Sequence, residues 1–250
     1  MGDISINGAK VLIYNEMLGG PVLTETVVNT WIVMAVIAFA CWFLGHDLKV
    51  HANSKRQHLA EYAVGFVNKL VRESMGPQWM NYVPMIASIL LLSCLGSLSS
   101  LFTLFAPTGD LSTLLGWAAV VFVLITYYKI KCGGLGNYVK GFFAPIPVMA
   151  PMNVISEIAT PVSMAFRHFG NIASGSVISA LIYAALAAGS NALLGWLPGA
   201  LGDVLGAIPI LQVGIPAILG LYFDLFTAVI QAYIFSMLTM MYIAGAAATD

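Results

Sequence analysis

The sequence predicts an all-α polytopic membrane protein, and two observations lead to this fold class. The chain of 250 residues is 60% hydrophobic and 8% charged, with a mean hydropathy of +0.90, whereas soluble domains carry about 25% charged residues. Its apolar runs reach or exceed the ~20 residues that a helix needs to cross a bilayer. The predicted architecture is an N-terminal span, a surface amphipathic helix, a helical hairpin, and two long, strongly tilted membrane helices that form an antiparallel hairpin.

The composition also narrows the functional class. The net charge is −1, and no cluster of basic residues indicates a nucleic-acid partner. The three cysteines, Cys41, Cys94 and Cys132, form no CxxC motif and have no histidine at ligand spacing. We therefore expect isolated thiols, and neither a metal nor another cofactor. No GxxxxGK[ST] phosphate-binding loop is present in the sequence, so the chain is not expected to hydrolyse a nucleotide by itself.

The predicted single membrane domain, residues 1–250, begins with an extramembrane arm. Residues 1–26 carry four charged side chains, which make the segment too polar for a signal peptide. The first span follows over residues 27–45, with Trp31 and Trp42 near its ends as interfacial anchors.

Residues 46–78 form the most charged part of the chain. Leu59, Tyr62, Phe66 and Leu70 recur at helical spacing within it, which indicates an amphipathic helix at the membrane surface. A small soluble hairpin between two spans is the alternative.

Residues 82–128 predict a helical hairpin. Its first arm contains serines and glycines of the kind that let membrane helices approach closely. The turn Pro107–Asp110 sends the chain back, and we expect Asp110 on the outer side, where it can also cap the returning helix. A short basic loop, Lys129 to Gly141, is expected next.

Residues 142–247 contain the two longest apolar elements, Met152 to Gly195 and Leu205 to Ala247. Each is over 40 residues long, and a helix of that length measures ~60 Å, twice the ~30 Å hydrocarbon thickness. Each must therefore be broken or strongly tilted. A tilted pair, which we expect to carry an ion pathway, suits a protein that wraps around a curved partner.

The basic residues predict the orientation. Of ten Lys and Arg residues, five lie between Gly45 and Gly76 and three between Lys129 and Gly141. One span precedes the first of these segments and two separate them, so both face the same side. The positive-inside rule places that side in the cytoplasm, with the N-terminus outside and, after five crossings, the C-terminus inside.

Arg167 lies inside the fourth predicted membrane element. No other Lys or Arg occurs from Gly141 to Asp250. A cation near the bilayer centre costs at least about 2.5–3.5 kcal/mol, and an arginine cannot escape by losing its proton. Ser163 and Asn171 stand one helical turn away on either side, so small and polar groups share a face with the guanidinium. A purely structural role is the alternative.

Asp224 and Gln231 form a second polar set, two helical turns apart on the last element. If the two long elements pair antiparallel with Arg167 level with Gln231, then Asp224 and Ser176 lie on its outer side and Glu157 on its cytoplasmic side. We expect two water-filled half-pathways that the arginine separates. Because no acid lies within four residues of Arg167, its counter-charge must come from another protein.

These residues also have structural alternatives. Glu157 could cap the helix after Pro151, Asp224 could be a paired structural group, and Gln231 could link two helices by hydrogen bonding. For the whole chain, the alternative is a stand-alone secondary ion transporter, which should show paired repeats with broken helices. The sequence has one polar hairpin without a second copy, and a scaffold without ion chemistry leaves Arg167 unexplained.

Four motifs, in this order along the chain, resemble subunit a of the F-type rotary ATP synthase. Pro107 to Leu111 is similar to that family's PTxDL turn, and Asn153 to Glu157 to its N-x-x-x-E pattern. Pro161 to Asn171 resembles its essential-arginine segment, and Gln231 to Phe235 its QAxIF segment. The resemblance covers about Pro84 to Tyr242.

The resemblance implies a non-catalytic stator subunit in the plasma (inner) membrane of a bacterium. Its partners would be the rotating c-ring, the peripheral-stalk subunit b and membrane lipids. In the family, the arginine matching Arg167 draws the c-ring carboxylates past and prevents a short circuit between two half-channels. The residue matching Gln231 lies beside the arginine, those matching Asn171, Ser176 and Asp224 line the outer half-channel, and the one matching Glu157 lines the inner one. The expected ion is H⁺ rather than Na⁺.

The chain departs from the family pattern at two places. Many members have Glu where this chain has Ser176, and His where it has Asp224, so Asp224 has to act as the outer relay by itself. His168 follows the arginine in place of the common Leu. We expect His168 to pack against neighbouring helices; a role as a proton carrier is the alternative.

Overall fold

The structure, a computed structural model, describes residues 10–15, 20–46, 48–49, 54–102, 104–144, 146–194 and 221–247. Within these residues, five helical stretches are long and apolar enough to cross a membrane, which confirms the predicted all-α polytopic class. They are Glu25–Gly45, Pro77–Phe102, Leu111–Phe142, Pro147–Ser190 and Thr227–Ala247. The expected turn between the two long elements, and the beginning of the last one up to residue 220, lie outside the described residues.

The N-terminal arm contains a β-hairpin that we did not expect from the sequence. Strand β1 (Val11–Asn15) pairs antiparallel with β2 (Gly20–Thr24). Helix α1 (Glu25–Gly45) follows directly and is the first predicted span. The Asn29 side chain of α1 donates a hydrogen bond to the Phe105 carbonyl at 2.9 Å, which ties α1 to the end of the next hairpin arm.

Helix α2 (Lys55–Ser74) is amphipathic, but its apolar residues divide between two environments. Val67 and Leu70 are buried in the protein core, whereas Leu59, Tyr62 and Phe66 are exposed. The C-terminal half of α2 therefore anchors the helix to the protein. The exposed apolar residues suit a membrane surface, as an interfacial helix requires.

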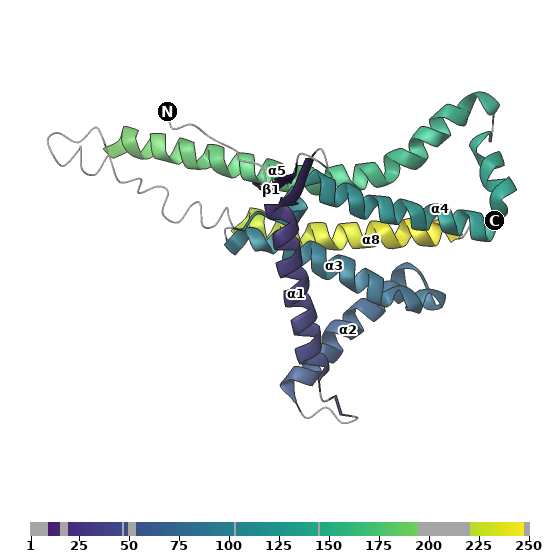
Figure 1. Cartoon of the computed structure of the whole chain (residues 1–250), viewed down its shortest axis with the longest axis horizontal. Coiled ribbons are helices and arrows are strands. Elements are labelled where there is room, and N and C mark those ends of the chain that lie inside the picture. The colour runs from purple at the N-terminus through teal and green to yellow at the C-terminus, as the bar shows by residue number, and fades with distance from the viewer. Residues whose placement is uncertain are drawn as a thin grey trace.

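A short 3-10 turn, η2 (Pro77–Tyr82), leads into α3 (Val83–Leu98), and the chain then returns in the opposite direction in α4 (Leu111–Phe142) (Figure 1). Helix α8 (Thr227–Ala247) packs against both of these arms and lies between them in Figure 1. The hydroxyls of Ser97 and Thr108 lie 2.9 Å apart where the two arms meet at the turn. Small residues let the chain approach this closely.

The expected basic loop between Lys129 and Gly141 is wrong, because α4 continues as a helix to Phe142. The helix is interrupted only at Gly134, whose φ of 76° lies in the left-handed region. Glycine adopts this conformation without the steric cost that a Cβ imposes. The chain can therefore change direction within a helical segment, and Lys129 stands on a helix rather than on a loop.

The last two membrane helices are α5 (Ala150–Leu194) and α8 (Thr227–Ala247), which run antiparallel (Figure 1). A π-helical segment, η7 (Leu221–Phe226), precedes α8. The 45 residues of α5 include Pro161, which cannot donate a backbone hydrogen bond to the carbonyl of residue 157. A proline within a helix is a common cause of a kink, and α5 changes direction along its length in Figure 1.

Helix α8 packs against both α3 and α4, and α5 packs mainly against α4. In Figure 1, α1 runs across the direction that these four helices share. This arrangement is expected if one upright span accompanies strongly inclined helices. The main core joins residues of α2, η2, α3, α4 and α8: Val67, Leu70, Val71, Met75, Trp79, Ile86, Val121, Ile125, Met240, Ile243 and Ala246.

Candidate functional site

The two faces of α5 differ around Arg167. One face is buried against neighbouring helices, and the other is exposed. Met164, Ala165 and His168 belong to the buried face, and Ser163, Phe166 and Arg167 to the exposed face. Ala165 packs with Leu114 and Ala118 of α4, so the contact with α4 fixes which side of α5 points outward.

The guanidinium of Arg167 has no hydrogen bond or ion pair with any residue that the structure describes. The side chain is exposed in the isolated chain, on a helix apolar enough to span a membrane. An unpaired cation in such a place is costly. Within the described residues, no acidic side chain supplies the opposite charge.

His168, next to Arg167, points into the protein and is fully buried. Its Nε2 lies 3.4 Å from the Ser93 hydroxyl of α3, and its ring packs edge-on against Phe235 of α8, with ring centroids 5.8 Å apart. Nδ1 has no hydrogen-bond partner among the described residues. The side chain thus joins α5 to α3 and α8, immediately behind the arginine.

Gln231 lies on α8 with 5% of its surface exposed. Phe235, which contacts His168, stands one helical turn after it. The ring contact places His168 of α5 level with Phe235 of α8. Because the two helices run antiparallel, Arg167 lies on one side of this contact and Gln231 on the other. The described residues contain no hydrogen bond between the two side chains.

The residues predicted for the outer side are only partly described. Asn171 is half-buried and Ser176 is exposed, and the Ser176 hydroxyl donates to the Ala173 carbonyl at 2.8 Å within α5. Asp224 belongs to η7, and its side chain lies outside the described part of the chain. Their assembly into one pathway stays a prediction.

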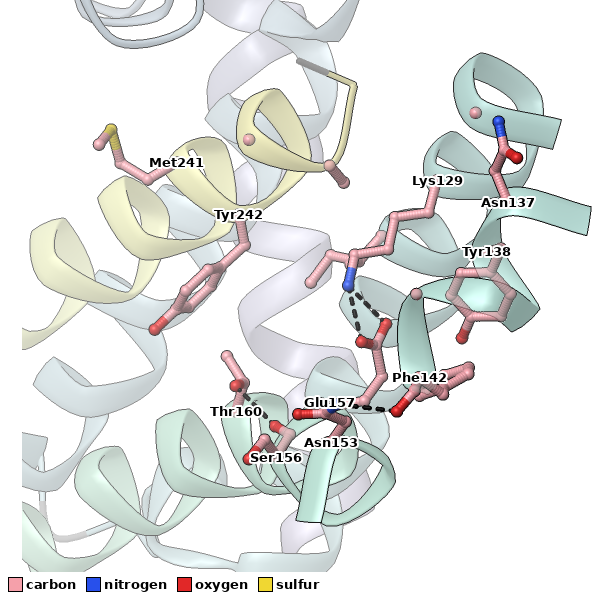
Figure 2. A pocket seen from close by; sticks show the side chains of 15 residues that line it. Lys129, Asn137, Tyr138, Phe142, Asn153, Ser156, Glu157, Thr160, Met241 and Tyr242 are labelled. Carbon is pink, nitrogen blue, oxygen red and sulfur yellow. Dashed lines mark hydrogen bonds and ion pairs between the residues drawn. The ribbon is translucent and has the colours of Figure 1, made fainter. Parts of the chain in front are cut away.

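A cavity of about 660 Å³ lies between the C-terminal half of α4, the beginning of α5 and the end of α8 (Figure 2). Hydroxyl, amide and charged side chains line it together with apolar ones. The lining residues are Ile125, Lys129, Gly133, Asn137, Tyr138, Gly141, Phe142, Asn153, Ser156, Glu157, Thr160, Met241, Tyr242, Gly245 and Ala246. We call this space the inner cavity, after the side on which the sequence predicts Glu157 to lie.

An ion pair between Lys129 and Glu157 crosses the inner cavity from α4 to α5 (Figure 2). The Lys129 ammonium donates to both carboxylate oxygens, at 2.8 and 2.7 Å. The side chains of Lys129 and Glu157 are 30% and 14% exposed. Such a charge-assisted double contact is stronger than a neutral hydrogen bond. We did not single out Lys129 from the sequence, where its only signal was a positive charge on the same side as Glu157.

The beginning of α5 is also tied to α4 by neutral contacts. The Asn153 side chain donates to the carbonyls of Phe142 and Ala144, at 2.8 and 3.0 Å. The helix begins at Ala150, so Glu157 stands beyond its first turn and does not cap it. Both polar residues of the N-x-x-x-E pattern, Asn153 and Glu157, thus join the beginning of α5 to the C-terminal half of α4 and the residues that follow it.

Asp110 stands at the other end of α4, away from the inner cavity. It occupies the N-cap position, and its carboxylate accepts a hydrogen bond from the Ser112 backbone N–H at 2.9 Å. Within the described residues, no group of His, Cys, Asp and Glu could hold a metal ion.

The fold and the site together define a polytopic membrane protein with a separate polar cavity and, on an outward helix face, an arginine that no described residue pairs with. A family model described as "ATP synthase A chain" matches residues 27–244. The chain therefore belongs to this family, as its motifs indicated, and it is a membrane-sector subunit of the ATP synthase complex.

Individual relatives agree with the family assignment. "ATP synthase subunit a 1" of Crocosphaera subtropica is 32% identical over 225 residues, which cover 89% of this chain and 86% of the relative. "ATP synthase subunit a, sodium ion specific" of Propionigenium modestum is 31% identical over 243 residues, covering 91% of this chain and 75% of the relative. "ATP synthase subunit a 1" of Chlorobium luteolum is 29% identical over 243 residues, covering 96% of each.

Proposed function

We propose that this chain is the non-catalytic stator subunit that carries two offset aqueous half-channels to and from a rotating c-ring. Arg167 lies between the half-channels and prevents direct passage. The observation that carries this proposal is the exposed guanidinium of Arg167 on a membrane helix, with no partner among the described residues. A ring of carboxylates moving past the exposed face of α5 supplies the missing charge in turn.

Two groups of residues form the half-channels in this proposal. The inner half-channel is the inner cavity, which contains Glu157. Polar groups of α4, α5 and α8 line it. The outer one contains Asn171, Ser176 and Asp224. Ser163 and Gln231 flank the arginine along α5 and α8. Two separate hydrated spaces with one fixed cation between them let protons reach the ring without crossing the membrane directly.

The chain's other partners and its orientation belong to the same proposal. The apolar residues exposed on α1, among them Trp31, Phe39 and Trp42, suit contact with membrane lipids and with a peripheral-stalk subunit b.

The charge distribution supports an N-terminus outside and a C-terminus in the cytoplasm of a bacterium. We propose H⁺ as the transported ion.

Thiol accessibility tests the two half-channels. In a chain whose native cysteines are replaced, Asn171→Cys and Asp224→Cys should react with a membrane-impermeant thiol reagent added outside, and Glu157→Cys with the same reagent added on the cytoplasmic side. Val120→Cys is the control, because Val120 lies on an exposed apolar face of α4 and should meet lipid rather than water. Labelling from the reverse sides would contradict the proposed orientation.

A further inference from the structure

The Lys129–Glu157 ion pair affects which ion can pass the inner cavity. The two half-channels alone leave this choice open. We propose that Lys129 is a specificity-determining residue of the inner cavity. Its ammonium occupies the place on Glu157 that Na⁺ would take, so the cavity passes protons and rejects alkali cations. This inference rests on the proposed function of the inner cavity.

Binding of Na⁺ in the inner cavity depends on free oxygen ligands. A hard cation that enters a protein needs oxygen ligands, and carboxylates are the strongest that side chains offer. Among the described residues that line the cavity, Glu157 is the only carboxylate. Both of its oxygens already accept hydrogen bonds from Lys129, at 2.8 and 2.7 Å. No free carboxylate is left there for Na⁺.

The charges in the cavity lining also disfavour Na⁺. Within the described part of the lining, Lys129 and Glu157 are the only charged residues, and their charges cancel. A sodium ion near Glu157 would therefore face the ammonium at close range, and the low exposure of the pair weakens solvent screening of that repulsion.

A proton needs no such vacant site. It can pass between water and hydroxyl groups, which both donate and accept hydrogen bonds. Tyr138, Ser156, Thr160 and Tyr242, which carry hydroxyl groups, are among the residues that line the same cavity. The lining therefore suits proton transfer while the carboxylate of Glu157 is closed to metal ions.

The cavity does not depend on the ion pair alone. Asn153 holds α5 to the end of α4 through two carbonyls, and α8 packs against both helices. Replacing Lys129 should therefore expose the Glu157 carboxylate without dismantling the junction.

Lys131 provides a matched control. It stands two residues further along α4 and does not line the cavity. Its ammonium lies over the rings of Tyr127 and Tyr128, 5.6 and 5.8 Å from their centroids. Lys131→Met removes the same charge from the same helix but leaves the pair intact.

The test uses ATP synthase that contains each variant, reconstituted in vesicles with the cytoplasmic side outward. ATP-driven H⁺ pumping is measured with Na⁺ or choline added outside at equal ionic strength. In the Lys129→Met enzyme, we expect sodium to slow H⁺ pumping by about threefold or more, because Na⁺ binds the freed carboxylate of Glu157. Lys129→Gln, which keeps a neutral donor beside Glu157, should be slowed too. The wild type, Lys129→Arg and Lys131→Met should pump equally in both salts.

A double variant separates ion binding from a structural effect. Adding Glu157→Gln to Lys129→Met removes the carboxylate and should abolish the sodium effect, even if pumping is slower throughout. A sodium effect that persists in the double variant would overturn the inference, as would Lys129→Met and Lys129→Gln variants that pump equally in both salts. If Glu157→Cys is not labelled from the cytoplasmic side, the inner half-channel itself fails. Labelling without a sodium effect refutes only the role of Lys129.

Discussion

Arg167 and His168 are neighbours in sequence, but they face opposite environments. Arg167 points away from the protein, whereas His168 is fully buried between α3 and α8. Successive helix residues are about 100° apart, so an anchor at one position orients the next. The His168 contacts thereby help to fix the direction in which the guanidinium points.

Replacing His168 tests whether it acts by packing. In His168→Leu, loss of a buried nitrogen without a described partner relieves about 1–3 kcal/mol. The variant also loses a ring contact of about 0.5–1.5 kcal/mol and the hydrogen bond with the buried Ser93 hydroxyl, a further ~0.5–1.5 kcal/mol. Because these contributions nearly cancel, we expect the thermal midpoint of the complex to change little and ATP-driven pumping to remain within about twofold of wild type. Ser93→Ala, which removes the hydroxyl partner, is the control. Pumping lost in His168→Leu despite full assembly would instead make His168 a proton carrier.

At the scale of elements, the end of α4 and the beginning of α5 form the inner cavity through two departures from a regular helix. Gly134 interrupts α4 with a positive φ, and Pro161 leaves the carbonyl of residue 157 without its usual backbone donor. The residue whose carbonyl lacks this donor is Glu157, and its side chain forms the ion pair with Lys129. Both helix irregularities and the ion pair therefore lie where the end of α4 meets the beginning of α5.

Asp110 belongs to the opposite end of α4, and its variants separate capping from ion conduction. Asp110→Ala removes the acceptor for the Ser112 N–H and should destabilise the first turn of α4 by about 1 kcal/mol, whereas Asp110→Asn should retain the cap. Hydrogen exchange at the start of α4 should quicken in the Ala variant only. Pumping that falls equally in the Asn variant would show that the charge of Asp110, rather than its cap, is needed.

The sequence was sufficient for elements with a strong periodic or apolar signal. The first span, the α3–α4 hairpin and the length of α5 follow from hydrophobic runs and from the Pro107–Asp110 turn. The end of α4 was not predictable in this way, because Lys129 to Gly141 combines charges with glycines and resembles a loop. The β1–β2 hairpin was missed because its short strands offer few residues for a pattern.

At the scale of the whole molecule, packing decides which polar groups meet. The exposed arginine and Glu157 were singled out from sequence as isolated charges in apolar surroundings. The partner of Glu157 was not, because Lys129 comes from another helix and meets it only after α4 and α5 pack together. Contacts between distant residues of this kind leave no local signal in one sequence.

The packing also explains why one face of α5 remains available. Helix α8 lies against α3 and α4, and α5 adds to this group mainly through α4. Ala165 and Met164 fill the contact side, which leaves Arg167 outward. The whole fold therefore presents one permanent positive charge where a second protein can approach within the membrane.

The most direct test of this account is the rate of proton-driven ATP synthesis in vesicles that contain Arg167→Lys. Lysine keeps a positive charge but can lose its proton when buried, whereas arginine cannot. We expect the variant complex to assemble and synthesis to be abolished, while Arg72→Lys on α2 keeps its activity. Synthesis at a near wild-type rate in Arg167→Lys would contradict the central role of the guanidinium.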